Sequence, residues 1–401
     1  MLSTPAEFPV SDIDPFDEDF LTEPHEAHEQ LRTLGAAVRF TSYDAWGIAR
    51  YEHVHAALND AESFSSSAGV GLSDFRKEKP WRRPSLLLEA DPPEHTTARR
   101  VLTWVLSPAV IRTMRSAFAT AAAELFDGLA DREQIDGIGD IAEIYPPLVL
   151  GDALGLPEQG RENLAAYGNM VLNSFGPRNR LFEESVSSVD DISRWISRHC
   201  ERDALRPGGL GVRIHETAEA EGLSPEEGAL LVRSLLTAGV DTSVQSIGAA
   251  LMCLAGNPDQ FALLRETPTL ARAAFEEAIR LVSPVQTFFR TTTRDVVVGD
   301  VTIPEGEKVL LFLGAANRDA REWPDPDRYD IARRAAGHVG FGSGIHACVG
   351  QMIARLEGEI VITELARRAT AIELAGPPVI RLNNTLRSLD SLPLRLHRPH
   401  R

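Results

Sequence analysis

Cys348 stands in a glycine-rich stretch whose residue types and spacing could prepare a sulfur atom for chemistry. Residues 341–350 read FGSGIHACVG. Glycine tolerates positive φ and lets backbone N–H groups approach a neighbouring atom closely, so we expect amides to point at the sulfur and favour its thiolate. Residues 351–367 have a helical pattern, and a helix N-terminus also favours negative charge. Such a cysteine is a metal ligand or a nucleophile; the alternative is a turn around a buried structural cysteine.

A second unusual stretch, AGVDT at residues 238–242, lies inside a long apolar helical pattern. The residues Ser-Pro-Glu-Glu at 224–227 have the spacing of a helix N-terminal cap. We expect the helix that they start to run to about Ala255 and to be buried. A glycine inside a helix costs about 1 kcal/mol relative to alanine, and a neighbouring acid is costly to bury. The two penalties indicate a functional site, and a cap-like Asp-Thr at a helix break is the alternative.

Both stretches resemble conserved motifs of the cytochrome P450 family. Residues 341–350 carry every fixed position of the family's haem-binding pattern F-G-x-G-x-H-x-C-x-G, and AGVDT matches its oxygen-binding kink. The resemblance implies that Cys348 is the axial thiolate ligand of a haem b iron. It also implies haem contacts by Phe341, Gly342, Ala238, Gly239 and, at a propionate, His346.

The resemblance assigns catalytic roles to Asp241 and Thr242, which would deliver protons during oxygen activation. It also supplies further haem contacts. The DPPEHTTAR sequence at 91–99 implies that His95 and Arg99, four residues apart on one helical face, bind the propionates; the alternative is a surface pair. Arg290, in the strand-rich tract 285–313, matches another propionate-binding arginine.

Glu277 and Arg280 match the family's E-x-x-R motif, three residues apart on one helix. The motif implies a structural pair that locks the core behind the haem-binding loop, with Arg328 as its third member. Elsewhere, residues 38–40 and 45–49 read as a β-hairpin and residues 183–205 as one helix. Residues 175–179 break the helical pattern and are predicted to form a mobile lid.

The resemblance covers essentially the whole chain and implies one P450 domain, residues 1–401. The expected fold is mainly α (α+β), a helix-rich haem-binding prism with a smaller β-rich region. Three cysteines form no disulfide framework, no secretory signal is visible, and no apolar run approaches about eighteen residues. The net charge of −17 disfavours nucleic acid and anionic membranes as partners. We therefore expect a bacterial, cytoplasmic protein.

Within the family, the chain is most similar to bacterial enzymes that demethylate para-substituted benzoates such as 4-methoxybenzoate. The shared stretches are 69–82, 283–296 and 338–351. This resemblance implies that the substrate carboxylate is held by Arg82, Ser85 and Ser234, with Arg233 and Thr237 nearby. This chain departs from the subfamily pattern at Leu172, where the subfamily's enzymes have an aromatic residue, and at Ser243, where they have threonine. Apolar walls are expected from Leu88, Leu172, Phe175, Val285, Thr287 and Phe288, although Phe288 could equally be ordinary core.

The helix geometry is consistent with this assignment. Ser234 precedes Thr242 by eight residues, about 12 Å of helix, so an anion held at Ser234 would direct a para substituent toward the iron. Positions 234, 238, 241, 242 and 245 share one face, whereas Arg233 lies one residue off it and is expected to act indirectly. The alternative is a serine bonded to its own helix and an Arg82 that faces solvent.

The expected reaction is monooxygenation with O2, by hydroxylation or O-demethylation of a small aromatic acid. No flavin or iron–sulfur motif is visible, so electrons are expected from NADH through a ferredoxin reductase and a [2Fe–2S] ferredoxin, which would dock near Cys348 and Arg355. The alternatives are a P450 that hydroxylates a terpene, steroid or macrolide, a peroxide-driven haem-thiolate enzyme, and a haem-based gas sensor or carrier.

Overall fold

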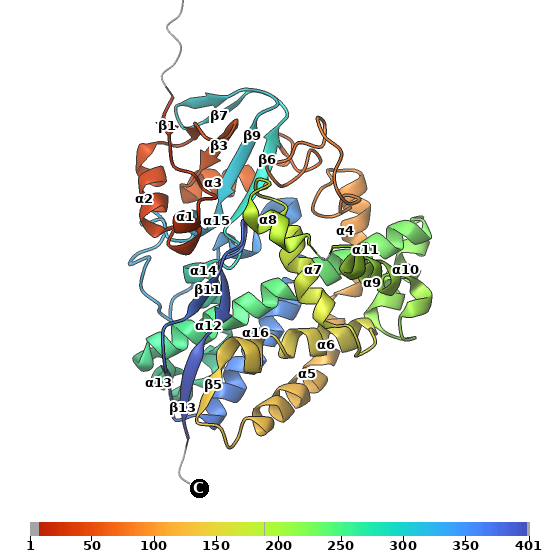
Figure 1. The fold of residues 1–401 in the computed structure, drawn as a ribbon, viewed down its shortest axis with the longest axis vertical. Helices are drawn as coiled ribbons and strands as arrows, with labels where there is room; N and C mark the ends of the chain where they lie inside the picture. The colour runs from red at the N-terminus through yellow and green to blue at the C-terminus, as the bar shows by residue number, and fades with distance from the viewer. Residues whose placement is uncertain (1–7, 188, 399–401) are drawn as a thin grey trace, which may run out of the picture.

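A six-stranded sheet forms one end of the molecule (Figure 1). Its strand order is β1-β2-β3-β9-β6-β4, with β2 and β3 paired antiparallel as the predicted hairpin. The strands are β1 (Val10–Ser11), β2 (Val38–Phe40), β3 (Ala45–Ile48), β4 (Phe64–Ser65), β6 (Thr287–Thr292) and β9 (Lys308–Phe312). This computed structural model describes residues 8–187 and 189–398.

Three smaller sheets complete the β structure. Strands β10, β13 and β5 form one, β11 and β12 a second, and β7 and β8 a third. Their bounds are β5 (Gln134–Asp136), β7 (Val296–Val298), β8 (Val301–Ile303), β10 (Ala371–Leu374), β11 (Val379–Arg381), β12 (Ser388–Ser391) and β13 (Pro393–His397).

Helices make up the rest of the molecule and bury a large apolar core that runs from α4 to α16. Figure 1 shows α5, α6, α12 and α16 at the end away from the six-stranded sheet. The α-helices before the centre of the chain are α1 (Glu18–Thr22), α2 (His25–Leu34), α3 (Tyr51–Asn59), α4 (Glu94–Val105), α5 (Pro108–Gly128), α6 (Tyr145–Leu154), α7 (Glu162–Asn173), α8 (Arg180–Ser185), α9 (Val189–His199) and α10 (Leu210–Ala220). Those that follow are α11 (Pro225–Ala238), α12 (Asp241–Gly256), α13 (Pro258–Glu266), α14 (Ala271–Val282), α15 (Leu313–Ala316) and α16 (Gln351–Arg368).

The central helical segment differs from the prediction because it is two helices rather than one. Ser224 starts α11 with a complete capping box, as predicted, but α11 ends at Ala238 and α12 begins at Asp241. The helix break named above as the alternative is therefore present, but Asp241 and Thr242 do not cap α12, whose N-cap residue is Val240 without a side-chain cap hydrogen bond. By length and composition the segment 225–256 could span a membrane, but 78% of its apolar window is buried inside the protein, as in the core helix of a soluble protein.

The segment 183–205 is also interrupted. Helix α8 ends at Ser185 and α9 runs from Val189 to His199, so one continuous helix was a wrong prediction. The neighbouring tract 175–179 is tied to the C-terminal part of the chain, because Asn179 and Asn384 exchange side-chain hydrogen bonds of 2.8 and 3.0 Å. These bonds hold one side of the tract that was predicted to be a lid.

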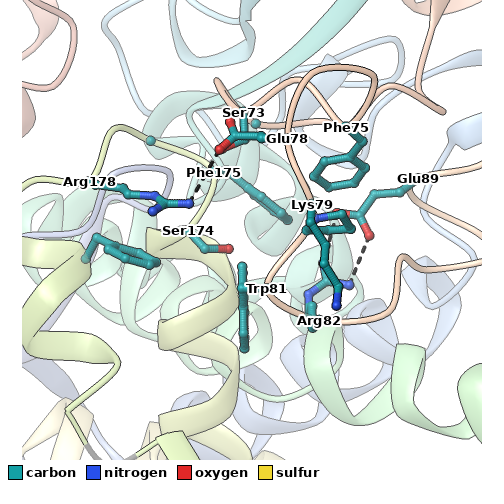
Figure 2. A pocket seen from close by; sticks show the side chains of 14 residues that line it. Ser73, Phe75, Glu78, Lys79, Trp81, Arg82, Glu89, Ser174, Phe175 and Arg178 are labelled. Carbon is teal, nitrogen blue, oxygen red and sulfur yellow. Dashed lines mark hydrogen bonds and ion pairs between the residues drawn. The ribbon is translucent and has the colours of Figure 1, made fainter.

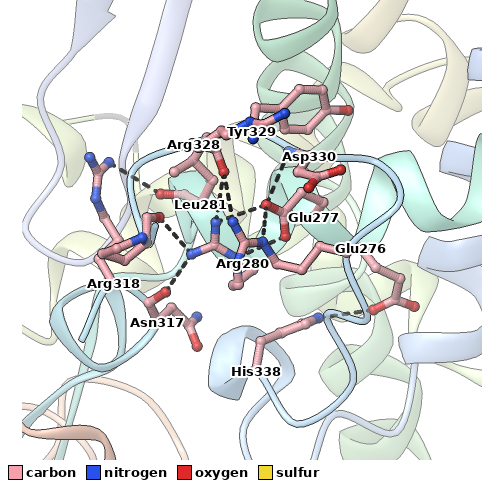
Figure 3. Close-up of polar contacts among 12 residues, drawn as sticks. Glu276, Glu277, Arg280, Leu281, Asn317, Arg318, Arg328, Tyr329, Asp330 and His338 are labelled. Atoms are coloured by element: carbon pink, nitrogen blue, oxygen red, sulfur yellow. Dashed lines mark hydrogen bonds and ion pairs between the residues drawn. The ribbon is translucent and has the colours of Figure 1, made fainter. Parts of the chain in front are cut away.

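The E-x-x-R motif lies in α14, behind the cysteine loop, and forms a fully buried ion pair (Figure 3). Arg280 donates from Nε and Nη2 to the two carboxylate oxygens of Glu277, each at 2.8 Å. The third member is Arg333, whose Nε donates to Glu277 at 2.9 Å. The prediction of Arg328 is wrong, because Arg328 contributes only its backbone carbonyl, which accepts from Arg280 at 3.3 Å.

Candidate functional site

A cavity with an empty volume of about 1750 Å³, partly open to solvent, lies between the central helices and the cysteine loop. Most of the predicted site residues line it, although they are scattered through the sequence. They are Arg82, Ser85, Leu88, Arg99, Leu172, Phe175, Arg233, Ser234, Thr237, Ala238, Gly239, Thr242, Val285, Phe288, Arg290, Phe341, Gly342, His346 and Cys348. Asp241, Thr287 and His95 lie outside the lining.

The cysteine loop presents its sulfur at one end of this cavity. Gly342 and Gly344 have φ of 68° and 66°, a backbone conformation that favours glycine. The backbone N–H groups of Gly350 and Gln351 hydrogen-bond the sulfur, as predicted. Both amides lower the pKa of the Cys348 thiol, which is the predicted direction, but burial outweighs them and the pKa is raised overall. A metal cation at the sulfur would supply the missing compensation.

Two imidazoles meet beside this loop with buried nitrogens that have no protein partner. The rings of His95 and His346 lie 4.4 Å apart between centroids. Within residues 8–187 and 189–398, neither Nε2 atom has a hydrogen-bond partner. Burial, and next the neighbouring Arg290, lower the pKa of His346 to about 3.

Two arginines face the same end of the cavity. Arg290 is buried, and its one hydrogen bond to the described residues is donated to the adjacent carbonyl of Phe289, at 2.8 Å; burial lowers its pKa to about 10. Arg99 donates to the carbonyl of Ala347. Asp91 acts electrostatically on Arg290 and His95, but among the described residues no carboxylate forms an ion pair with these donors, and the cluster fits the propionate groups of a haem. Cys348 and these four basic residues would therefore hold the cofactor.

The acid of the kink points away from the cavity. Asp241 is fully buried, and its Oδ1 accepts from Arg381 at 3.0 Å, whereas Oδ2 has no partner among the described residues. Burial raises the pKa of Asp241, and Arg381 offsets part of this shift. Arg381 is 27% exposed and reaches Glu143 at 3.8 Å. A polar path thus connects the surface to Asp241.

Thr242 follows Asp241 and does line the cavity. Its hydroxyl donates to the Ala238 carbonyl at 2.5 Å across the helix break. The predicted common face is only partly correct, because Ser234, Ala238 and Thr242 line the cavity whereas Asp241 and Gln245 do not. The break at residues 239–240 interrupts the helical register on which that prediction relied.

The lining also carries polar side chains among largely apolar residues. The Ser85 and Ser234 hydroxyls lie 3.1 Å apart. Ser234 also bonds its own helix, at the Leu230 carbonyl, but Arg82 does not face solvent, since only 11% of its side chain is exposed. Arg233 lines the cavity directly, although the sequence favoured an indirect position for it.

Comparisons with known proteins identify the family to which these features belong. A cytochrome P450 family model matches residues 211–371. Cytochrome p450 CYP199A2 from Rhodopseudomonas palustris is 55% identical over 392 residues, which cover 98% of this chain and 95% of that protein. This chain belongs to the cytochrome P450 family. The P450 fold and a monooxygenase activity, predicted from the motifs, are thereby confirmed.

More distant P450 relatives cover the chain almost completely. The 6-deoxyerythronolide B hydroxylase of Saccharopolyspora erythraea is 31% identical over 94% of this chain and 97% of its own length. The structure of cytochrome P450 CREJ in complex with (4-ethylphenyl) dihydrogen phosphate superposes with a TM-score of 0.86 at 25% identity, covering 96% of this chain and 99% of that one. Membership of this family implies a haem iron cofactor, which the donor set described above fits.

Three charged residues of this P450 were not found from the sequence. Glu89 pairs with Arg82, Arg381 pairs with Asp241, and Glu357 on α16 is buried with no ion-pair partner among the described residues. Burial raises the pKa of Glu357 to about 8, and the neighbouring Ser243 offsets only part of this. An acid within the apolar run LLLEA at 86–90 was the available signal for Glu89; Arg381 had none, since its partner lies 140 residues away.

Proposed function

We propose that this P450 oxidises a small aromatic carboxylic acid, such as a para-substituted benzoate, by hydroxylating or O-demethylating its para substituent. The observation that carries the proposal is the distribution of polarity in the cavity. Arg82, Ser85, Arg233 and Ser234 form a polar group in which the two serine hydroxyls lie 3.1 Å apart, and most other residues of the lining, which includes Cys348, are apolar.

Each group of residues has a distinct task in this proposal. The two serine hydroxyls and the guanidinium groups bind the carboxylate, and Leu172, Phe175 and Phe288 pack against the ring. The bound haem supplies the oxygen activation. The hydroxyl of Thr242, which lines the cavity, would donate a proton there, and Asp241 would pass protons inward from Arg381 and solvent.

The substrate anchored in this way would present its para position to the haem. A neutral terpene, steroid or macrolide would leave Arg233, which has no ion-pair partner among the described residues, without a counter-charge, which is unfavourable. The aryl phosphate bound by the distant relative CREJ is likewise a para-alkylated aromatic anion, which supports the same class of ligand here.

The proposal includes the electron supply and the cellular setting. Electrons would pass from NADH through a reductase and a [2Fe–2S] ferredoxin, in the cytoplasm and without nucleic-acid or membrane partners. The docking region would lie near Cys348, where the Arg355 guanidinium packs 4.5 Å from the Phe341 ring centroid and is paired with Glu276. The whole chain is proposed to act as one domain.

Reconstituted turnover tests this function. With NADH, a ferredoxin and its reductase, 4-methoxybenzoate should yield 4-hydroxybenzoate and equimolar formaldehyde. Arg82→Ala should raise KM for the acid by about tenfold or more, since a charge-assisted hydrogen bond contributes about 1.5–3 kcal/mol. Arg83→Ala is the matched control, because Arg83 is exposed and should leave KM unchanged. No product from the acid, or an Arg82→Ala variant with wild-type KM, would contradict the proposal.

A further inference from the structure

Arg82 belongs to a wall between two cavities. Besides the large cavity, a smaller outer one with an empty volume of about 580 Å³ lies between residues 71–82 and residues 174–182. Arg82 and Phe175 line both cavities, whereas Glu89 lines only the outer one. Figure 2 shows the outer cavity with the Arg82–Glu89 pair and, elsewhere on its rim, the pair of Glu78 and Arg178.

Glu89 neutralises Arg82 from the outer side. Its two carboxylate oxygens accept from Nη1 and Nη2 of Arg82 at 2.9 and 3.0 Å, and only 2% of its side chain is exposed. The same carboxylate accepts from the backbone N–H of Ser85 at 2.8 Å. A bidentate pair at such low exposure is weakly screened by water, so its charges act strongly on nearby ligands.

Arg233 lies in the same electrostatic environment without a carboxylate of its own. Its Nη2 donates to the carbonyl of Arg83 at 2.6 Å, and no ion pair links it to an acid within the described parts of the chain. Burial first, and Arg82 as well, lower the pKa of Arg233, whereas Tyr167 and Glu89 raise it. Two guanidinium groups and one carboxylate thus leave one positive charge at this end of the cavity.

We propose that Glu89 is a specificity-determining residue that restricts the anion-binding end of the cavity to one net positive charge and thereby selects monoanionic aryl acids over dianionic ones. The inference rests on the proposed function, because it assumes that an acid binds beside Arg82 and Arg233. A single substrate carboxylate balances the remaining positive charge. A second carboxylate would be repelled by Glu89, and no further positive charge in this group of three side chains would offset the repulsion.

The test is Glu89→Gln, which keeps the side-chain size and an oxygen that can accept from Ser85 while it removes the charge. Calorimetric titration of the haem-loaded protein uses three ligands with the same ring: methyl 4-methoxybenzoate, 4-methoxybenzoate and 4-methoxybenzene-1,2-dicarboxylate. Each ligand's Kd in the variant is compared with its own Kd in the wild type, so steric differences cancel. We expect no change for the ester, about tenfold tighter binding of the monoanion and about a hundredfold for the dianion.

Two further variants keep the inference falsifiable. Glu78→Gln removes the same charge from the rim of the outer cavity, where Glu78 is 42% exposed, and should alter no Kd by more than about twofold. Arg233→Gln lowers the charge instead and should weaken the binding of the monoanion and, more strongly, of the dianion, with no effect on the ester. Arg233→Gln also tests the inference if the Glu89→Gln variant does not bind haem.

The outcomes separate this inference from the proposed function. A change of Kd by the same factor for all three ligands, or weaker monoanion binding in Glu89→Gln, overturns the role of Glu89. The proposed function would still stand after such a result with Glu89→Gln, provided that the wild type prefers the acid to the ester and that Arg82→Ala abolishes this preference. A wild type that binds the ester in preference to the acid overturns both.

Discussion

Two buried carboxylates of this P450 form different kinds of ion pair with arginine. Glu277 and Arg280 are fully buried, share two hydrogen bonds of 2.8 Å, and receive a further bond from Arg333. Asp241 is equally buried, but within the described residues only its Oδ1 is hydrogen-bonded, to Arg381, whose side chain is 27% exposed. The hydrogen bonds fix the position of the Glu277 carboxylate. The raised pKa of Asp241, together with an oxygen that has no partner among the described residues, allows Asp241 to exchange a proton.

Breaking the satisfied pair is expected to have the largest effect. Glu277→Gln leaves the buried Arg280 without its counter-charge, and removal of one partner of a buried pair costs about 3–5 kcal/mol. The free energy of unfolding, measured by chemical denaturation, and the haem content should both fall steeply. Arg367→Ala removes from Glu364 an arginine partner that is 60% exposed, and Glu364 keeps its second partner Arg368. It is the control and should change stability by less than about 1 kcal/mol. A Glu277→Gln variant as stable as the wild type would contradict this account.

Asp241→Asn should instead spare the fold and impair the reaction. The amide keeps the shape of the carboxyl group but cannot pass a proton, so kcat should fall by about a hundredfold. The denaturation midpoint and the Kd for the acid should stay near their wild-type values, and the solvent isotope effect on kcat should rise. A wild-type kcat would show that protons reach the cavity by another path.

Glu357 extends the comparison to a buried carboxyl group that has no cation. Its pKa is raised from 4.5 to about 8, so between these values the native protein keeps a proton that the unfolded chain has lost. Stability should therefore fall as the pH rises from about 5 to 8, by roughly 1 kcal/mol per pH unit. Glu357→Gln should flatten this slope in denaturation measured across the range, and an unchanged slope would refute the assignment.

The smallest expected effect concerns Arg381. Because Arg381 lowers the pKa of Asp241, Arg381→Ala should raise that pKa further and shift the acidic limb of the pH–kcat profile toward higher pH. We expect a decrease of kcat at neutral pH by less than about tenfold. Arg381→Lys keeps the positive charge and should leave the limb near its wild-type position, whereas equal profiles for all three proteins would exclude this coupling.

The sequence predicted the groups that lie in short motifs and missed those that folding brings together. The cysteine loop and the pair of Glu277 with Arg280 depend on local spacing and have the predicted geometry. The Asp241–Thr242 stretch was also found from its spacing, but the helix breaks there and only Thr242 lines the cavity. Arg333 replaces the predicted Arg328, because the folded loop after α15 and not sequence order decides which side chain reaches Glu277.

The differences within the helices have a related cause. A propensity pattern continues through residues 239 and 240, but the structure breaks there and changes which side chains share a face. The Arg82–Glu89 pair adds an effect that no motif records, since the arginine assigned to the substrate already has a carboxylate partner. Net charge at a site depends on such neighbours and is visible only after folding.

The most direct test of the central claim is a titration of the ferric protein, followed by its Soret band, with 4-methoxybenzoate and with the methyl ester. We predict that the acid produces the substrate-induced spin-state shift at a lower concentration than the ester, and that Arg82→Ala abolishes this preference. A response to the ester alone, or wild-type acid affinity in Arg82→Ala, would contradict a cavity built to hold a carboxylate.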